Sequence, residues 1–137
     1  MINGVILSRL QSLDKTLLEL RSLGKVSVGD LEADWRTRRA VERDLQVLVE
    51  IVIDVCQRLI SLTGQTPATS GSEAVQRCIQ IGILTDFEPY RKMVQFRNFI
   101  VHRYEQVDTA FLADMVNRRL PDFERFRREV IQYVGRG

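Results

Sequence analysis

Hydrophobic residues recur along the chain at helical spacing, in segments separated by short polar stretches that contain most of the glycines and prolines. The first segment covers residues 3–23. Its apolar positions keep the i, i+4, i+7 spacing of one helix face: Ile6, Leu10, Leu13, Leu17 and Leu20. The stretch GKVSVGD, residues 24–30, begins with a glycine of the kind that ends helices and is predicted to be a loop.

The longest predicted helix covers residues 34–63. Its predicted core stripe consists of Val41, Leu45, Leu48, Val49, Val52, Cys56 and Leu59. The run VLVEIVIDV widens this stripe, which indicates contacts on more than one side. The helix ends at TGQTPATSGS, where glycine, serine, threonine and proline predict a loop, and we expect residues 64–72 to be the most mobile part of the chain.

Two pairs of residues have the spacing of a capping box, in which a Ser or Thr and a Glu three residues later satisfy the first backbone N–H groups of a helix. Ser70 with Glu73 predicts a short helix that runs to about residue 84. Thr85 with Glu88 predicts the start of another helix, which runs to position 102 or 104. Pro89 fits there because a proline is tolerated in the first turn of a helix.

The last helical stretch is predicted to begin after Asp108, a suitable N-cap, with Phe111, Met115, Phe123, Phe126, Val130 and Val134 facing inwards. Pro121 should kink or split it, because proline lacks a backbone N–H and clashes with the preceding turn. No segment alternates with a period of two. The sequence therefore predicts one all-α domain over residues 1–137, an up-and-down four-helix bundle with one short additional helix.

Composition excludes several classes of protein. The chain has 137 residues, is 45% hydrophobic and contains no apolar run long enough to cross a bilayer. The N-terminus shows no basic leader, so we expect no signal peptide and a cytoplasmic location. Cys56 and Cys78 are expected to be buried, and with one histidine they cannot make up a zinc site. No metal or other cofactor is expected.

Positive charge is concentrated in the second part of the chain. Residues 1–89 contain 10 Lys and Arg against 12 Asp and Glu, whereas residues 90–137 contain 10 against 6. This asymmetry is compatible with a bound polyanion, although solvated helix faces are also often basic.

The segment QFRNFIVHRYEQVD, residues 95–108, contains the only histidine, His102. At about 100° per residue, Asn98 and His102 share one helix face, while Arg97 and Tyr104 share another about 100° away. Spacing alone leaves two interpretations open. His102 could be a catalytic group, or it could complement the dipole at a helix end, with Tyr104 as an ordinary core-edge aromatic residue.

Within this segment, RNFIVHRY matches R-x-x-x-x-H-x-Y, the signature of HEPN domains, and its surroundings resemble the HepT toxins. The run RRAVERDLQVLVEIVIDVCQRLI resembles the long second helix of HepT-like proteins, and LPDFERF resembles their last helix. The resemblance thus covers most of the chain and is strongest over residues 93–108.

This resemblance implies a homodimeric, metal-independent endoribonuclease, the toxin of a HEPN/MNT toxin–antitoxin system, with tRNA a plausible target. Arg97 and His102 correspond to the catalytic pair of the family, and Asn98 to the polar residue that supports them. Tyr104 corresponds to the residue that a minimal nucleotidyltransferase antitoxin modifies with AMP, in an assembly that can be a larger hetero-oligomer. Near the motif, three basic residues are candidate RNA contacts: Arg91, Lys92 and Arg103.

The chemistry of these residues is compatible with RNA cleavage. An imidazole transfers protons near neutral pH, and a guanidinium matches the oxygens of a phosphate. Since each chain has one histidine, a two-fold axis would bring two copies of His102 and Arg97 to one cleft. The alternative is a non-catalytic helical protein that binds a nucleotidyltransferase or positions a nucleotide for it. Trp35 could belong to the core or to an interface.

Overall fold

Helix α3 is the central element of the computed structural model, which describes residues 3–102 and 108–136, without the side chains at positions 101, 102 and 136. It spans Trp35–Leu62 and contacts every other α-helix of this part of the chain. Its predicted stripe is buried throughout, from Val41 to Leu59. Ile51, Val55 and Ile60 are buried as well, which is why the hydrophobic run in this helix is wide.

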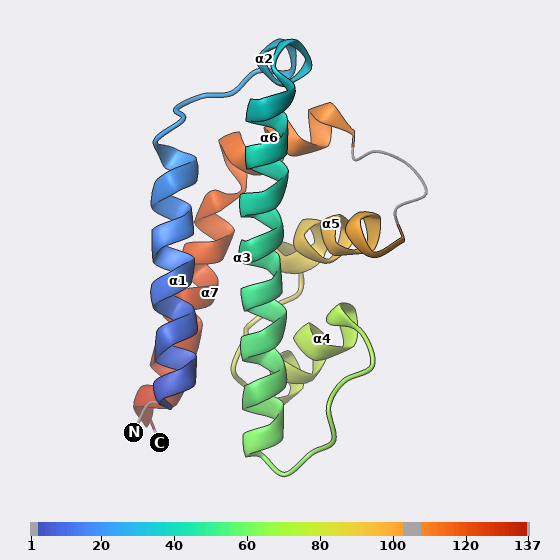
Figure 1. Cartoon of the computed structure of the whole chain (residues 1–137). Helices are drawn as coiled ribbons and strands as arrows, with labels where there is room; N and C mark the ends of the chain where they lie inside the picture. The colour runs from blue at the N-terminus through green and yellow to red at the C-terminus, as the bar shows by residue number, and fades with distance from the viewer. Residues whose placement is uncertain (1–2, 103–107, 137) are drawn as a thin grey trace.

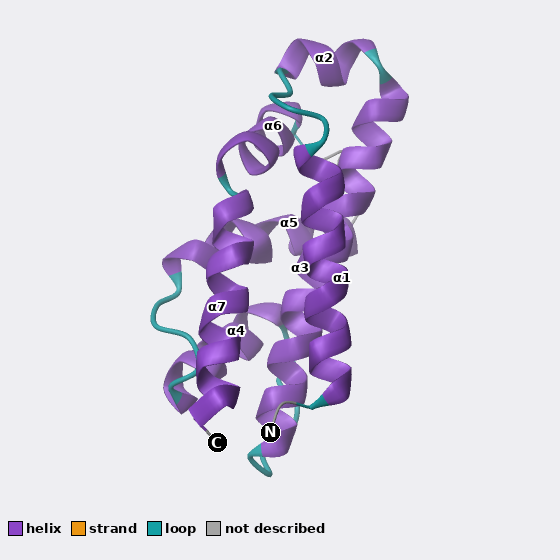
Figure 2. Ribbon diagram, turned by 90° about the vertical axis from the view of Figure 1, so that its left-hand side faces the viewer, coloured by secondary structure: helices purple, strands orange, loops and turns teal. Residues whose placement is uncertain are grey.

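The other elements surround α3. In chain order they are α1 (Gly4–Arg21), α2 (Val28–Ala33), α4 (Gly71–Ile81), the 3-10 helix η1 (Glu88–Tyr90), α5 (Arg91–His102), α6 (Thr109–Arg118) and α7 (Leu120–Arg136). Helices α1 and α7 lie along one side of α3, α4 and α5 lie on its other side, and α2 and α6 lie towards one end (Figure 1, Figure 2). No strand occurs in residues 3–102 or 108–136, and the predicted all-α bundle is confirmed.

Most predicted helix ends are confirmed by their caps. Asn3 Oδ1 accepts the N–H of Val5 at 2.8 Å, and Asp108 Oδ1 accepts the N–H of Ala110 at 2.7 Å. Caps of this kind each stabilise a helix by about 1 kcal/mol. The predicted split at Pro121 is also confirmed, because α6 ends at Arg118 and the proline lies in the first turn of α7, where no N–H is required.

Two predictions about helix starts are wrong. Residues 28–30 are not a loop, because Ser27 and Asp30 form a capping box that opens α2. Thr85 does not cap a helix with Glu88. Its backbone N–H donates instead to Glu129 Oε2 of α7 at 3.0 Å, and the next helical element begins at Glu88, whose N–H donates to Asp86 Oδ1.

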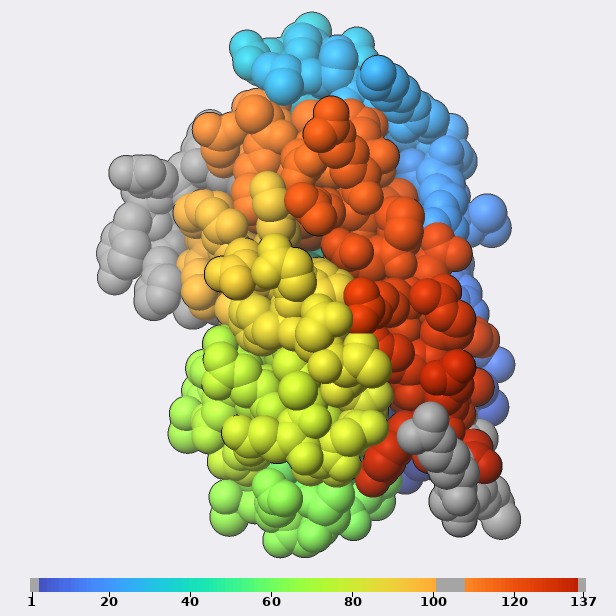
Figure 3. Space-filling model, turned by 180° about the vertical axis from the view of Figure 1, so that it is seen from behind, coloured from blue at the N-terminus to red at the C-terminus, as the bar shows by residue number. Residues whose placement is uncertain are grey.

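The turn between α4 and α5 is held against α7 by this contact. Glu129 is nearly buried, and Arg125 links it to Thr85 and Asp86 through bonds of 2.6–3.1 Å. Seen from behind, the yellow residues that lead into α5 lie directly against the red helix α7 (Figure 3). The start of α5 is therefore positioned by a charged, partly buried network as well as by apolar packing.

The loop after α3, predicted to be mobile, is hydrogen-bonded on both sides. The side-chain amide of Gln57 donates to the carbonyl of Ala68 and accepts from its N–H, at 2.9 and 2.8 Å. Arg77 of α4 donates to the carbonyl of Thr66. The loop thus closes α3 onto α4 with specific bonds.

Cys56 and Cys78 are buried, as predicted, and the Cys78 thiol lies 3.7 Å from the carbonyl oxygen of Cys56. Trp35 is 66% exposed, so it does not belong to the core. Within the described residues, no helix combines the length and the apolar character needed to cross a membrane.

Candidate functional site on helix α5

Arg97 lies at the point where α5 crosses α3. Its side chain is half-buried and lines a small pocket together with Gln46, Val49, Glu50, Phe96 and Ile100. Gln46 and Glu50 are one turn apart on α3 and border the buried Val49, and Phe96 and Ile100 are on α5 with Arg97. The arginine is thus held between two helices and keeps access to solvent.

The start of α4 forms another wall of this site. Gly71, the first residue of α4, is buried, and a Cβ placed there would lie 3.7 Å from Arg97 Cδ and 2.8 Å from Ile53 Cδ1. The absence of a side chain at position 71 therefore lets the stem of Arg97 and the side chain of Ile53 pack over the first turn of α4.

The charge of Arg97 has no carboxylate partner among residues 3–100 and 108–135. Most other arginines of these ranges do, and their ion pairs include Arg9 with Asp54 at 3.1 Å and Arg58 with the same carboxylate at 2.9 Å. A half-buried guanidinium without such a partner is suited to bind an anion, because its planar donors match carboxylate or phosphate oxygens.

The other motif residues are described in part. Asn98 is exposed, next to Arg97 on α5. The backbone of His102 belongs to the last turn of α5, as predicted, and its side chain lies outside the described residues. Arg103 and Tyr104 also lie outside them. The structure therefore places Arg97 and Asn98 on one helix that runs to position 102.

Aromatic rings add contacts from α5, and from the turn before it, to the last two helices. The rings of Phe96 and Phe111 stack with centroids 6.4 Å apart and nearly parallel planes, and Phe99 meets Phe111 edge-on at 5.6 Å. Before α5, the ring of Tyr90 packs edge-on against Phe126 at 6.1 Å. Pairs of this kind contribute about 0.5–1.5 kcal/mol beyond the burial of their area. These contacts connect α5 to α6, and η1 to α7.

The predicted RNA contacts Arg91 and Lys92 both have acidic neighbours. Arg91 pairs with Glu88 at 3.2 Å and is largely exposed. Lys92 Nζ lies 3.2 Å from Asp114 Oδ2 and 5.4 Å from the centre of the Phe111 ring. Burial acts to raise the pKa of Asp114, but the hydrogen bonds and charges of Lys92 and Arg119 outweigh it and lower that pKa. An RNA phosphate would have to compete with these carboxylates.

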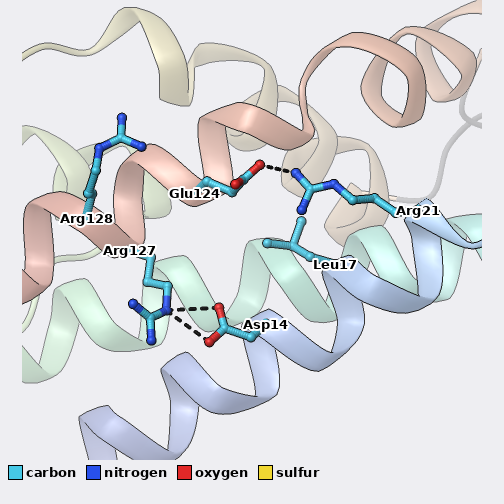
Figure 4. A pocket seen from close by; sticks show the side chains of 6 residues that line it. All are labelled: Asp14, Leu17, Arg21, Glu124, Arg127 and Arg128. Atoms are coloured by element: carbon cyan, nitrogen blue, oxygen red, sulfur yellow. Dashed lines mark hydrogen bonds and ion pairs between the residues drawn. The ribbon is translucent and has the colours of Figure 1, made fainter.

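A second pocket lies between α1 and α7, away from α5 (Figure 4). Ion pairs cross it between Arg21 and Glu124 and between Arg127 and Asp14, the latter at 2.9 Å, and Leu17 also lines it. Because these arginines are neutralised by carboxylates of the facing helix, the pocket is a polar seam that joins the two helices.

The residues of α3 that border Arg97 were not predicted from the sequence. Gln46 and Glu50 are four residues apart on α3, and Gln46 Nε2 donates to Glu50 Oε1 at 3.0 Å. Their spacing is visible in the sequence as an ordinary pair on a helix surface. Only the packing of α5 on α3 shows that they border the arginine.

The sequence and the structure were compared with known proteins. Residues 13–130 match the sequence model of the family described as Ribonuclease HepT-like. A search of curated protein sequences found no match. Among solved structures, the tri-AMPylated Shewanella oneidensis HEPN toxin, in complex with MNT antitoxin, superimposes with a TM-score of 0.85 at 20% identity and covers 96% of this chain and 99% of its own.

A second solved structure, of a toxin–antitoxin complex with AMP-PNP, gives a TM-score of 0.84 at 19% identity and covers 95% of this chain and 99% of its own. At these identities the likeness establishes a shared fold. The family match spans most of the chain and includes Arg97 and His102 of the R-x-x-x-x-H-x-Y motif. The chain therefore belongs to the HepT-like ribonuclease family.

Proposed function

We propose that this chain is the toxin of a HEPN/MNT toxin–antitoxin system and acts as a metal-independent endoribonuclease. The observation that carries the proposal is the motif itself: Arg97, half-buried and without a carboxylate partner among the described side chains, precedes His102 on α5 in a chain of the HepT-like family. RNA provides its own nucleophile, the ribose 2′-OH, so the enzyme needs only to move protons and to stabilise charge.

In the proposed reaction the 2′-oxygen attacks the adjacent phosphorus and the bond from phosphorus to the 5′-oxygen breaks. The products are a 2′,3′-cyclic phosphate and a 5′-hydroxyl. One His102 imidazole accepts the 2′-OH proton, and an imidazolium returns a proton to the leaving 5′-oxygen. Arg97 stabilises the negative charge that accumulates on the phosphate oxygens. Asn98, exposed on the preceding turn, supports the pair.

A homodimer would supply both proton-transfer groups. Within one helix, positions 97 and 102 are about 140° apart around the axis at about 100° per residue. Two chains related by a two-fold axis could place His102 of one beside Arg97 of the other, and would bring two imidazoles to one cleft. We therefore propose that the active form is dimeric.

Substitutions on α5 test this function. Arg97→Ala and His102→Ala should each abolish cleavage of cellular RNA and growth inhibition while circular dichroism and unfolding midpoints stay close to the wild type. The matched control is Arg128→Ala, since Arg128 of α7 also lacks a carboxylate partner in the described part of the chain, and it should cut RNA normally. RNA with a 2′-deoxy sugar at the cleavage site should stay intact. Cleavage that survives His102→Ala would disprove the mechanism.

We further propose that a minimal nucleotidyltransferase neutralises the toxin by AMPylation of Tyr104. The solved structures described above, an AMPylated HEPN toxin with MNT antitoxin and a complex with AMP-PNP, support this for relatives. An AMP group two residues beyond His102 would add bulk and negative charge next to the catalytic pair and repel RNA phosphates. Mass spectrometry after co-expression with a neighbouring nucleotidyltransferase should find the adduct on Tyr104, and Tyr104→Phe should prevent it.

The same observations allow a second function, that of a non-catalytic partner of a nucleotidyltransferase. It is supported by the antitoxin complexes among the structural relatives. A purified, unmodified dimer that binds the nucleotidyltransferase tightly and leaves all RNA intact would favour this alternative.

A further inference from the structure

The exposed face of the first half of α3 bears a row of arginines that leads to the Arg97 pocket. The row consists of Arg36, Arg39 and Arg43, all exposed. At about 100° per residue, these three lie with Gln46 and Glu50 within an arc of about 80° around the helix axis. Because Gln46 and Glu50 line the pocket of Arg97, the arginine row and the pocket share one continuous surface.

The three guanidinium groups take no part in the ion pairs of the described residues. Within residues 3–100 and 108–135, none of them forms an ion pair with a carboxylate, although ten other arginines of these ranges do. Arg38 differs because it points towards α6, where it donates to Thr109 Oγ1 at 2.6 Å, and it pairs with Glu42. Positive charge without a carboxylate ion pair is thus concentrated on one helix face.

An exposed aromatic residue ends the row. Trp35, at the start of α3, is 66% exposed, and the guanidinium of Arg36 lies 5.4 Å from its ring centre. Single-stranded nucleic acids are bound by this combination, in which cationic side chains contact phosphates and aromatic rings stack on bases. From position 36 to position 46 the helix rises about 15 Å, which is long enough to contact several nucleotides.

We propose that the α3 arginine row, with Trp35, is a docking surface for single-stranded RNA that guides the strand to Arg97. The inference rests on the ribonuclease function proposed above. It adds the location of the part of the RNA strand that extends beyond the catalytic pair. Phosphates bind Arg36, Arg39 and Arg43, a base stacks on Trp35, and Glu50 limits the basic surface at its end near the pocket.

Binding measurements with matched variants test this surface. The probe is a fluorescent single-stranded RNA of mixed sequence, and fluorescence anisotropy is recorded at several salt concentrations in the His102→Ala background to prevent cleavage. The triple variant Arg36→Gln, Arg39→Gln, Arg43→Gln should bind at least tenfold more weakly. Its slope of log affinity against log salt should fall by about 2, since each phosphate contact to a single strand contributes about 0.7.

The control removes the same charge elsewhere, through Arg9→Gln, Arg127→Gln and Arg128→Gln, and should keep the affinity within about twofold and change the salt slope by less than about 0.5. Trp35→Ala should weaken binding by about tenfold, within the range expected for loss of one stacked base, and should leave the salt slope unchanged. When His102 is retained, the triple variant should have a lower kcat/KM for RNA than the wild type. Its kcat at saturating RNA should be unchanged.

Three outcomes would overturn the inference. If the triple variant and its control bind RNA equally well, the α3 surface does not dock RNA. The proposal that Arg97 and His102 cleave RNA would still stand. If the triple variant loses a nucleotidyltransferase partner and keeps its RNA affinity, the surface serves a protein. If the wild type cuts no RNA and the His102→Ala chain binds none, the proposed function fails and the docking surface fails with it.

Discussion

Arg97 packs its stem over Gly71, so that a Cβ at position 71 would lie 3.7 Å from Arg97 Cδ and only 2.8 Å from Ile53 Cδ1. The first distance is an ordinary van der Waals contact and the second is too short. A side chain at position 71 would therefore displace Ile53 before it disturbed the arginine. The start of α4 is a structural support for the site.

Gly71→Ala should lower the free energy of unfolding by about 1 kcal/mol, because the added methyl group overpacks the site against Ile53. In the background Ile53→Val, which removes Cδ1, the same substitution should be neutral or stabilising, since alanine is the better helix former. Chemical denaturation of the four proteins of this double-mutant cycle gives the coupling. Equal effects of Gly71→Ala in both backgrounds would show that the contact is unimportant.

Asp114→Asn should strengthen RNA binding several-fold. Asp114 forms ion pairs with Lys92 at 3.2 Å, Arg119 at 3.5 Å and Arg118 at 4.0 Å, so its loss would free three cations, of which Lys92 lies on α5. Fluorescence anisotropy in the His102→Ala background should show a steeper dependence on salt. Asp14→Asn is the matched control, because it frees Arg127 in the seam between α1 and α7, and it should leave RNA affinity unchanged. An unchanged affinity for Asp114→Asn would remove Lys92 from the candidate RNA contacts.

Glu129→Ala should destabilise the fold by about 2 kcal/mol, because it leaves the partly buried N–H of Thr85 without an acceptor. Arg125 would keep its bond to Asp86. Glu124→Ala removes the exposed ion pair with Arg21 and should cost less than about 1 kcal/mol, as surface pairs do. Thermal or urea unfolding measures both. Similar losses for the two variants would mean that the turn before α5 is not held by Glu129.

The free energy of unfolding should decrease at acidic pH because Glu73 becomes protonated. Hydrogen bonds from Thr69, with the help of Arg77, lower the pKa of Glu73 from 4.5 to about 2. A carboxylate whose pKa is lower in the folded state contributes stability above its ordinary pKa, and this contribution is lost as pH falls from about 4.5 towards 2. Glu73→Gln should flatten the plot of unfolding free energy against pH in this window. Equal slopes for wild type and Glu73→Gln would contradict the assignment.

Much of the fold could be predicted from the sequence because it depends on local rules. The apolar stripe of α3, the N-cap Asp108 and the split at Pro121 all follow from helix periodicity and from which backbone N–H groups lack partners. Each of these features is decided by residues within one or two turns.

The wrong prediction at Thr85 arises because a polar residue has hydrogen-bond partners both nearby and far away in the sequence. Thr85 has Glu88 at the right spacing for a capping box, but it binds Glu129, 44 residues away, because α7 packs against this turn. The capping spacing of Ser70 and Glu73 is realised in part: Ser70 Oγ accepts the N–H of Glu73, while the Glu73 carboxylate accepts from Thr69. Long-range packing determines which of the alternative hydrogen-bond partners is used, and the periodicity of the sequence carries no information about this packing.

The same limit applies to the site. The motif identified Arg97, Asn98 and His102 as candidates because their spacing is local, and their catalytic roles stay predictions. The walls around Arg97 come from α3 and α4, and they could not be found from spacing within α5. The unpaired state of Arg36, Arg39 and Arg43 is likewise visible only once the partners of the other arginines are known.

The first turn of α1 and the last turn of α7 lie together at one end of the bundle, on the side of α3 that faces away from α4 and α5 (Figure 1). Fluorescent labels or affinity tags joined to either end would thus be remote from Arg97 and from the start of α3. Surface immobilisation through the termini would leave both regions open to solution, and a linker between the two ends would give a circularly permuted chain that could be reopened between α3 and α4.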